Sequence, residues 1–475
     1  MGLLLEARAQ GTFNERFDLF GEGMGQFGWG IEVKANGDAL VLFNGDYTDD
    51  SLYYGSAVSS VVVSPAGVFS AGFRLQIPER ATYPGWANCA SPRQEGGYIL
   101  GGSTATWGDT ARAALYWLDE DGVVTNFSEL DLPGHDWIGR QAKQAADGGF
   151  VVVGETSSLE TIDAFVAKTD AQGEVEWVKT FGGVMDDYAL AVDLRQLGGY
   201  FVGGQSRISS SNKQLWVLAL DDTGAVAWSK IWGTQYDEPN AHLTTSADGN
   251  ILVASAWGTS PNDNYAKYLA KLDKTDGAIM WDRTYGPPSE GCPLYAVKEV
   301  HAGGDLIAVG HSYQNASYYG VLLRTTSQGD SLWMRYYQYY DSVVTNGRGL
   351  LRDVQPTPDG GFVAAGVALG VSGQYTQDVW VIKVDSMGCI EPGCHLVTGV
   401  ETQLTNLRDA LTVSPNPVAR GGAISVELKL PQNFTPQGAL RLTLVSSDGR
   451  LISEQQLEGT TCELARSPLA STTCT

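Results

Sequence analysis

The chain has 475 residues, including 58 glycines and 10% aromatic residues, and its formal net charge is −23. This length allows two or three domains, or one large repeat domain with an appendage. The acidic balance excludes a nucleic-acid partner, which would need clustered lysine and arginine. No apolar run reaches the roughly 18 residues of a membrane-spanning helix, so we expect no membrane span.

The first residues, MGLLLEARA, are typical of the end of a secretory signal peptide. Leu3–Leu5 would close its apolar core, and the small residues Ala7 and Ala9 fit a cleavage pattern. We interpret residues 1–9 as a signal-peptide remnant, with an ordinary N-terminal segment as the alternative.

A glycine turn that opens a short strand recurs seven times between residues 36 and 366, with spacings of 50 to 59 residues. The turn glycines are Gly37, Gly96, Gly148, Gly198, Gly249, Gly303 and Gly360. A period of this length made of strands and turns is the signature of a β-propeller. We therefore predict an all-β fold, with a seven-bladed β-propeller over residues 12–395.

The repeat at 177–224 predicts four strands per blade, with YALAVD (188–193) innermost and a tryptophan-bearing strand outermost. The last repeat lacks that outer strand, and residues 12–21 resemble it. We predict that residues 12–21 complete the seventh blade and so close the ring. Four tryptophans follow a turn glycine by four residues and are expected to pack between blades, namely Trp177, Trp228, Trp281 and Trp333.

The tight turns should gather on one face of the ring and the longer loops on the other, where binding sites usually lie. The predicted long loops are 44–56, 103–112, 132–139, 233–239, 256–265 and 337–347. Aromatic side chains in or near such loops could stack on sugars or contact proteins, and packing within their own loops is the alternative. These candidate ligand-binding residues are Trp107, Trp137, Tyr236, Trp257, Tyr313 and Tyr375.

Paired carboxylates recur at similar places in two repeats, Asp186 with Asp187 and Asp237 with Glu238. Such residues bind either loop amides or a metal, and irregular loops of this kind can hold calcium. No cofactor is predicted, and calcium stays open as an alternative. The five histidines are scattered over different repeats, so we predict no catalytic residue and leave enzymatic activity open.

Cys389 and Cys394 flank a Pro-Gly turn in GCIEPGC, which favours a small disulfide loop in an oxidising compartment. Residues 396–410 are polar and are interpreted as a linker to a second domain at 411–475. Taken alone, the alternating segments of that domain predict a small antiparallel β-module.

The repeats at 12–395 resemble secreted propeller-like proteins of Bacteroidota-type bacteria. The C-terminal part resembles the type IX secretion (Por) sorting domain. This second resemblance rests on Pro415, Asn416 and Pro417, and on Asp448, Gly449 and Arg450 between two segments. It implies a small Ig-like β-sandwich that directs export through the type IX machinery, with surface attachment or release. The end, TTCELARSPLASTTCT, departs from the family pattern because it lacks the last apolar strand.

These observations predict a secreted or outer-surface protein, a monomer, that binds a glycan or a protein through the long-loop face without catalysis. Two alternatives remain: a polysaccharide hydrolase or lyase that uses the same face, and a purely structural surface protein.

Overall fold

The computed structural model describes residues 11–20, 25–48, 54–106, 110–134, 136–157, 161–196, 198–210, 212–239, 241–260, 264–301, 303–339, 348–369, 377–391 and 393–394, and five strands between 411 and 464. The chain forms two compact units, one of Gly11–Pro392 and one of Met1–Gln10 with Gly393–Thr475. Among the described residues the only helix is the short 3-10 helix η1 (Pro288–Glu290). None of these residues forms a helix long and apolar enough to cross a membrane.

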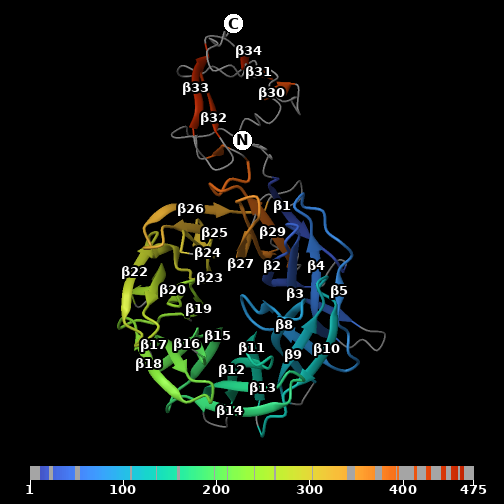
Figure 1. Ribbon diagram of the computed structural model, residues 1–475, viewed down its shortest axis with the longest axis vertical. Helices are drawn as coiled ribbons and strands as arrows, with labels where there is room; N and C mark the ends of the chain where they lie inside the picture. The colour runs from blue at the N-terminus through green and yellow to red at the C-terminus, as the bar shows by residue number, and fades with distance from the viewer. Residues whose placement is uncertain are drawn as a thin grey trace, which may run out of the picture. The chain divides into compact units, whose positions relative to one another are not determined.

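The larger unit is a seven-bladed β-propeller, as predicted, with its blades arranged in a ring around a common centre (Figure 1). Blade 1 consists of β2 (Gln26–Val33), β3 (Ala39–Thr48), β4 (Tyr54–Val63) and β5 (Phe73–Arg74). Blade 2 consists of β6 (Ala81–Pro84), β7 (Ala90–Pro92), β8 (Tyr98–Ala105), β9 (Arg112–Leu118) and β10 (Val124–Glu129). Blade 3 consists of β11 (Asp136–Gln144), β12 (Phe150–Ser157), β13 (Ile162–Thr169) and β14 (Val175–Phe181).

Blade 4 consists of β15 (Asp187–Leu194), β16 (Tyr200–Ser209), β17 (Asn212–Leu220) and β18 (Val226–Trp232). Blade 5 consists of β19 (His242–Thr245), β20 (Ile251–Ser260), β21 (Asn264–Leu272) and β22 (Ile279–Tyr285). Blade 6 consists of β23 (Leu294–Glu299), β24 (Leu306–Gln314), β25 (Ser317–Thr325) and β26 (Ser331–Tyr337). Blade 7 consists of β27 (Arg348–Pro356), β28 (Phe362–Leu369), β29 (Asp378–Val384) and β1 (Phe13–Phe17).

The first strand of a blade lies nearest the centre of the ring and the last strand lies at its rim (Figure 1). The second and third strands are apolar along almost their whole length, as in Phe150–Val153 of β12, because neighbouring blades cover both of their faces. Outer strands alternate between covered and open residues, as β18 does, because only one of their faces meets another blade.

The N-terminal strand closes the ring, as predicted from the sequence. β1 pairs antiparallel with β29, from Phe13 opposite Lys383 to Phe17 opposite Val379. The indole Nε1 of the fully buried Trp380 donates a hydrogen bond to Asn14 Oδ1 at 2.6 Å. Arg16 forms an ion pair with the buried carboxylate of Asp378. These contacts leave no open edge on β29 and satisfy polar groups that would otherwise be buried alone.

Adjacent blades are joined by a repeated contact between an aromatic ring and a glycine turn. A methyl group placed on Gly224 would lie 2.8 Å from the Trp177 ring, and one on Gly329 would lie 2.7 Å from Trp281. The contact occurs at six of the seven blade junctions, and Gly122 of blade 2 meets Leu40 of blade 1 instead. The aromatic partners are Phe13, Trp117, Trp177, Trp228, Trp281 and Trp333, and their glycines are Gly67, Gly173, Gly224, Gly277, Gly329 and Gly388. All six glycines have φ between +70° and +91°, so both backbone conformation and space require glycine there.

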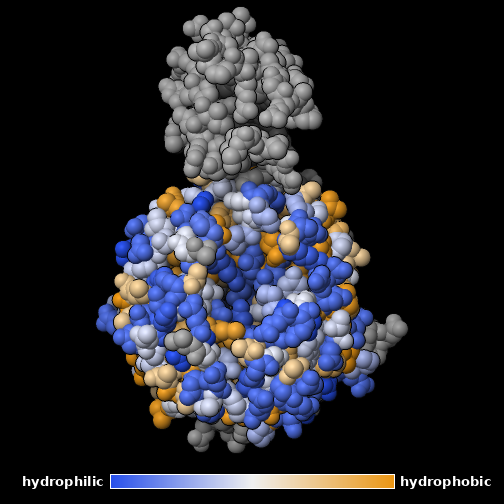
Figure 2. Space-filling view, viewed as in Figure 1, coloured by the Kyte–Doolittle hydropathy of each residue, from blue (hydrophilic) through white to orange (hydrophobic). Residues whose placement is uncertain are grey.

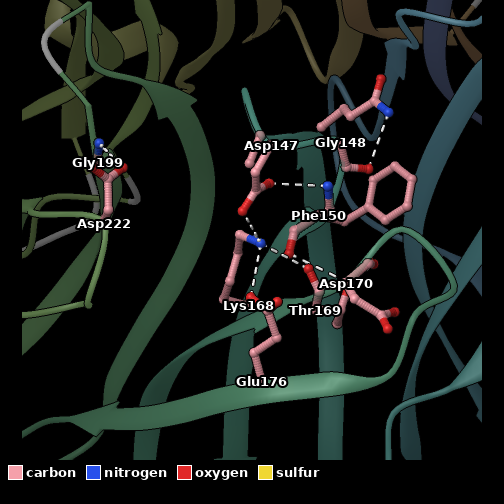
Figure 3. A network of polar contacts seen from close by, with 12 residues as sticks. Asp147, Gly148, Phe150, Lys168, Thr169, Asp170, Glu176, Gly199 and Asp222 are labelled. Atoms are coloured by element: carbon pink, nitrogen blue, oxygen red, sulfur yellow. Dashed lines mark hydrogen bonds and ion pairs between the residues drawn. The ribbon is translucent and has the colours of Figure 1, made fainter.

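Blades 3, 5 and 7 each have a lysine–carboxylate ion pair next to a short turn. Figure 3 shows Lys168 of β13 between two carboxylates, with its Nζ 2.8 Å from Asp147 and 3.0 Å from Glu176. The same pair of positions recurs as Lys271 with Asp248 at 2.7 Å, and as Lys383 with Asp359 at 2.7 Å. In the following turn the Asp170 carboxylate accepts the backbone N–H groups of Gln172 and Glu174. These local bonds hold the turns in one conformation.

In the second unit, β30 (Leu411–Ser414), β31 (Ile424–Leu428) and β34 (Thr461–Leu464) form one sheet. A separate pair consists of β32 (Leu440–Val445) and β33 (Leu451–Leu457). The two marker groups Pro415–Pro417 and Asp448–Arg450 lie outside the described residues, and the Ig-like sandwich stays a prediction.

Cys389 and Cys394 are both disulfide-bonded.

Candidate functional site

The meander sorts the connections of each blade onto two faces. Turns between first and second strands, such as 145–149, and between third and fourth strands, such as 170–174, share one face, which we call the short-turn face. Connections between second and third strands, and from one blade to the next, share the opposite face, which we call the long-loop face. Ala105 and Ala111, which flank the connection between β8 and β9, line a cleft on this face.

Two of the aromatic residues proposed from the sequence pack against a neighbouring aromatic ring. Trp137 is only 6% exposed and packs edge-on against Phe165, with ring centres 5.2 Å apart. Its Nε1 donates to the Pro133 carbonyl at 3.2 Å. Trp257 stacks on Tyr268 with ring centres 4.7 Å apart. Trp137 therefore offers no free face to a ligand, because the segment predicted as a loop at 132–139 already contains the start of β11.

The other proposed aromatics are spread over the ring. Tyr313 is 43% exposed and lies against Tyr318, at the end of β24. The Tyr236 hydroxyl accepts a hydrogen bond from Gln235. Trp107 and Tyr375 lie outside the described residues. The structure therefore does not gather the described candidates into one site.

The paired carboxylates accept hydrogen bonds from backbone N–H groups, within their own loop for Glu238 and Asp187 and from the start of a nearby strand for Asp237 and Asp186. Glu238 is fully buried, and its Oε1 accepts the N–H of Thr234 at 2.9 Å and the hydroxyl of the same residue at 2.7 Å. Asp237 accepts the Lys213 N–H, and Asp187 accepts the Gly183 N–H. Asp186 accepts the Ile162 N–H at 3.3 Å. Among the described residues, no group of three or more histidine, cysteine or carboxylate side chains is arranged to hold a metal.

A cleft of about 300 Å³ opens instead where blades 1, 2 and 3 meet. It exists because the inner strand of blade 2 is divided into β6 and β7, both paired with β8. The intervening chain bends toward its neighbours, where Trp86 N donates to the Arg140 carbonyl and Asn88 N to the Trp29 carbonyl. At this bend Gly85 lies so close to the Arg140 carbonyl that a side chain has no room.

The cleft combines aromatic rings with hydrogen-bonding groups. Tyr83 is 41% exposed, while the Trp29 and Trp86 rings are partly exposed and meet edge-on, with centres 6.1 Å apart. Asn44 accepts a hydrogen bond from Trp29 Nε1 at 2.6 Å. The buried Nε1 of Trp86 has no hydrogen-bond partner in the described structure. The polar side chains in the lining are Asn44, Ser103, Thr104 and Arg140.

A row of side chains extends from the cleft around the centre of the ring. The Arg140 guanidinium carbon lies 4.6 Å from the centre of the Trp86 ring. Beyond Trp29, the guanidinium carbon of Arg352 lies 5.3 Å from the Trp29 ring centre and 4.2 Å from that of Tyr295. The five residues Arg140, Trp86, Trp29, Arg352 and Tyr295 thus form a row of alternating cations and aromatic rings, which we call the cation–aromatic row.

Four members of this row occupy the same structural position. The register of the inner strand shifts at Trp29 in β2, at Arg140 in β11, at Tyr295 in β23 and at Arg352 in β27. A β-bulge leaves one residue unpaired and redirects its side chain. Each of the four lies eight positions before the turn glycine of its repeat. That offset is the signal in the sequence that could have identified them.

The two arginines of the row differ in how they are neutralised. Arg140 forms a two-pronged ion pair with Glu155, with one contact at 2.9 Å. Arg352 has no ion-pair partner in the described part of the chain. Burial, with the Arg352 charge, lowers the pKa of His242 and His311 to about 3, so both are neutral near pH 7. Arg352 therefore stands among uncharged aromatic groups.

A layer of charged side chains, namely Glu32, Lys143, Lys298 and Asp353, lies around the centre of the ring. Lys298 Nζ of blade 6 donates to Asn88 Oδ1 of blade 2 at 2.7 Å, although blades 7 and 1 lie between them in the ring. Burial raises the pKa of Glu32 to about 7, against the opposing charges of Lys298 and Lys143. Burial also raises the pKa of Asp353, whose carboxylate accepts the N–H groups of Ile31 and Val354. Figure 2 shows mostly hydrophilic residues around the hollow at the centre of the ring.

No protein-family model matches this chain, and no curated protein matches it. Several solved structures are similar to it at low identity. A protein from Dyadobacter fermentans described as of unknown function is 10% identical, with a TM-score of 0.43 over 79% of this chain and 99% of that one. The polysaccharide lyase Uly1 is 12% identical, with a TM-score of 0.43 over 76% and 90%. The quinohemoprotein alcohol dehydrogenase of Comamonas testosteroni is 9% identical, with a TM-score of 0.41 over 76% and 74%.

Proposed function

We propose that this propeller is a non-catalytic glycan-binding protein and that the cleft between blades 1, 2 and 3 receives the sugar. The observation that carries the proposal is the composition of this cleft, in which Tyr83, Trp29 and Trp86 stand beside amide and hydroxyl groups. Sugar rings have apolar faces that stack on aromatic rings and hydroxyls that exchange hydrogen bonds. A volume of about 300 Å³ falls at the lower end of the range for small-ligand sites, roughly 300–1,000 Å³.

The test is a glycan array followed by calorimetric titration of the glycans that bind. We expect Tyr83→Ala to weaken binding about tenfold or more, because the exposed ring supplies a stacking face. Tyr313→Ala is the matched control, since Tyr313 has the same side chain and a similar exposure of 43% but lies on β24. Binding that survives Tyr83→Ala and is lost in Tyr313→Ala would place the site elsewhere on the ring.

A polysaccharide hydrolase or lyase is the second candidate, and one observation favours it. His242 and His311 both pack against Tyr295 at the end of the cation–aromatic row, and burial keeps both imidazoles neutral near pH 7. A neutral imidazole can accept a proton, but a pKa of about 3 makes it a weak base near pH 7. We therefore expect binding without cleavage. Release of new reducing ends from a bound polysaccharide would establish the enzyme instead.

We also propose that the chain is exported by the type IX machinery and acts outside the cell, released or on the outer surface, as a monomer. The support is the likeness of residues 411–475 to sorting domains described above. Fusion of residues 396–475 to a reporter, expressed in a bacterium that has the pathway, should carry the reporter to the medium or the surface. Retention of the reporter in the periplasm would contradict the proposal.

A further inference from the structure

The cation–aromatic row continues past the cleft to Arg352, and the state of this residue suggests what the ligand carries. Arg352 is partly exposed, and its guanidinium lies between the rings of Trp29 and Tyr295. Trp29 is also part of the cleft lining. Any ligand long enough to extend from the cleft across Trp29 therefore meets the Arg352 side chain next.

The groups around Arg352 leave its charge uncompensated. Tyr295 is buried and its pKa is raised, so its phenol is neutral. His242 and His311 are neutral near pH 7 because burial lowers the pKa of each to about 3. Burial raises the pKa of the Cys292 thiol to about 11, so this group is neutral as well.

The nearby carboxylates are engaged elsewhere. Asp353 follows Arg352 in the chain, but it is 1% exposed, and its two oxygens accept the backbone N–H groups of Ile31 and Val354. Glu32 belongs to the neighbouring charged layer, where its charge faces Lys298 and Lys143. The described residues thus supply no anion for Arg352, in a chain whose formal net charge is −23. Arg352 contacts the neutral Tyr295 side chain and two aromatic rings, but it has no ion-pair partner among the described residues. A partly buried cation of this kind carries a desolvation cost that a bound anion would offset.

We propose that the glycan bound in the cleft carries an oxyanion substituent, a uronate carboxylate or a sulfate ester, and that this group binds Arg352. This inference rests on the proposed glycan-binding function and specifies its ligand class. A guanidinium presents a planar fork of donors that matches two oxygens of such a group. The flanking rings of Trp29 and Tyr295 hold the fork in place and keep water from part of it.

The experiment measures binding of the full chain to polygalacturonate, dextran sulfate and neutral dextran by calorimetry. We expect Arg352→Gln to weaken binding of an acidic polysaccharide about tenfold or more, because a charge-assisted bond is lost. Arg352→Lys keeps the positive charge but loses the planar fork of donors, so its affinity should lie between those of the wild type and Arg352→Gln. Arg283→Gln, an exposed arginine on β22, is the matched control for net charge and should bind as the wild type does.

Each outcome decides the proposal. If binding of polygalacturonate depends on Arg352, the group that Arg352 binds is a carboxylate. If only binding of dextran sulfate depends on Arg352, that group is a sulfate ester. Equal binding of an acidic polysaccharide by wild type and Arg352→Gln, with both variants folded by circular dichroism, would overturn the inference. If Tyr83→Ala still abolishes binding of that polysaccharide, glycan binding in the cleft stands even though the inference about Arg352 fails. Wild-type binding to glycans of the array but to neither acidic polymer would also overturn the inference alone, whereas no binding to any glycan overturns both.

Discussion

The contact between Trp281 and Gly329 allows a sharp test of how the blades are held together. Gly329 has φ of +81°, and a methyl group there would lie 2.7 Å from the Trp281 ring. Gly329→Ala should therefore cost about 1–2 kcal/mol for the left-handed backbone. It should cost about 1–3 kcal/mol more for overpacking against the ring. We expect the free energy of unfolding to fall by about 2–5 kcal/mol in total.

Two other glycines separate these two costs. Gly303 has φ of +70° but no heavy atom within 4 Å of the added methyl, so Gly303→Ala should show the backbone cost alone. A methyl group on Gly183 would meet no heavy atom within 4 Å, and this glycine lies outside the positive-φ region. Gly183→Ala should therefore leave the free energy of unfolding nearly unchanged. Urea unfolding followed by tryptophan fluorescence would measure the three variants. Equal losses for Gly329→Ala and Gly303→Ala would refute the role of the ring contact.

Three further predictions concern other parts of the propeller. Asn14→Ala leaves the buried Trp380 Nε1 without an acceptor and should lower the free energy of unfolding by about 1–3 kcal/mol, measured by urea titration. Glu15→Ala, at an exposed neighbouring site, should change this free energy little. Equal effects of the two substitutions would contradict the closure contact. Burial raises the pKa of Glu32 from 4.5 to about 7, so the folded chain holds a proton that the unfolded chain loses, and stability should fall as pH rises through this interval. Glu32→Gln should reduce that slope between pH 5 and pH 8, and an unchanged slope would exclude Glu32 as its source. Glu238→Ala removes the acceptor of two Thr234 hydrogen bonds and should lower the melting temperature. Calcium chloride should leave the melting temperature of the wild type unchanged. A rise of the wild-type melting temperature in calcium that is absent from Glu238→Ala would instead indicate a metal site.

The blade count was predictable because each repeat needs glycine for a local backbone reason. The seven turn glycines that set the period, from Gly37 to Gly360, all have positive φ. Other residues rarely adopt that conformation, so the glycine stays visible in the sequence even where the rest of the repeat varies. Ring closure was predictable from a different feature of the sequence. The last repeat lacks an outer strand, and residues 12–21 resemble that strand.

The candidate site was not predictable in the same way. The expectation that function lies in long loops directed attention to Trp137 and Trp257, whose rings pack against Phe165 and Tyr268. Trp29 and Arg352 instead belong to inner strands, and a β-bulge redirects both. Their proximity depends on which blades are adjacent when the ring closes, and Trp86 depends on the divided strand of blade 2. Hydrophobic periodicity records neither of these features.

Closure by β1 also sets the order in which the propeller can be completed. Arg16 and Asp378 pair across 362 residues, so the chain must form a loop of that length before the seventh blade is whole. At about 5–20 residues per second, the first strand waits roughly 20–70 s during synthesis for its partner. The loop-closure entropy grows to about 5 kcal/mol over this separation. During that interval the nascent β1 is an unpaired strand that a second copy could capture, so we expect strand exchange between newly made chains to be the main assembly error of this propeller.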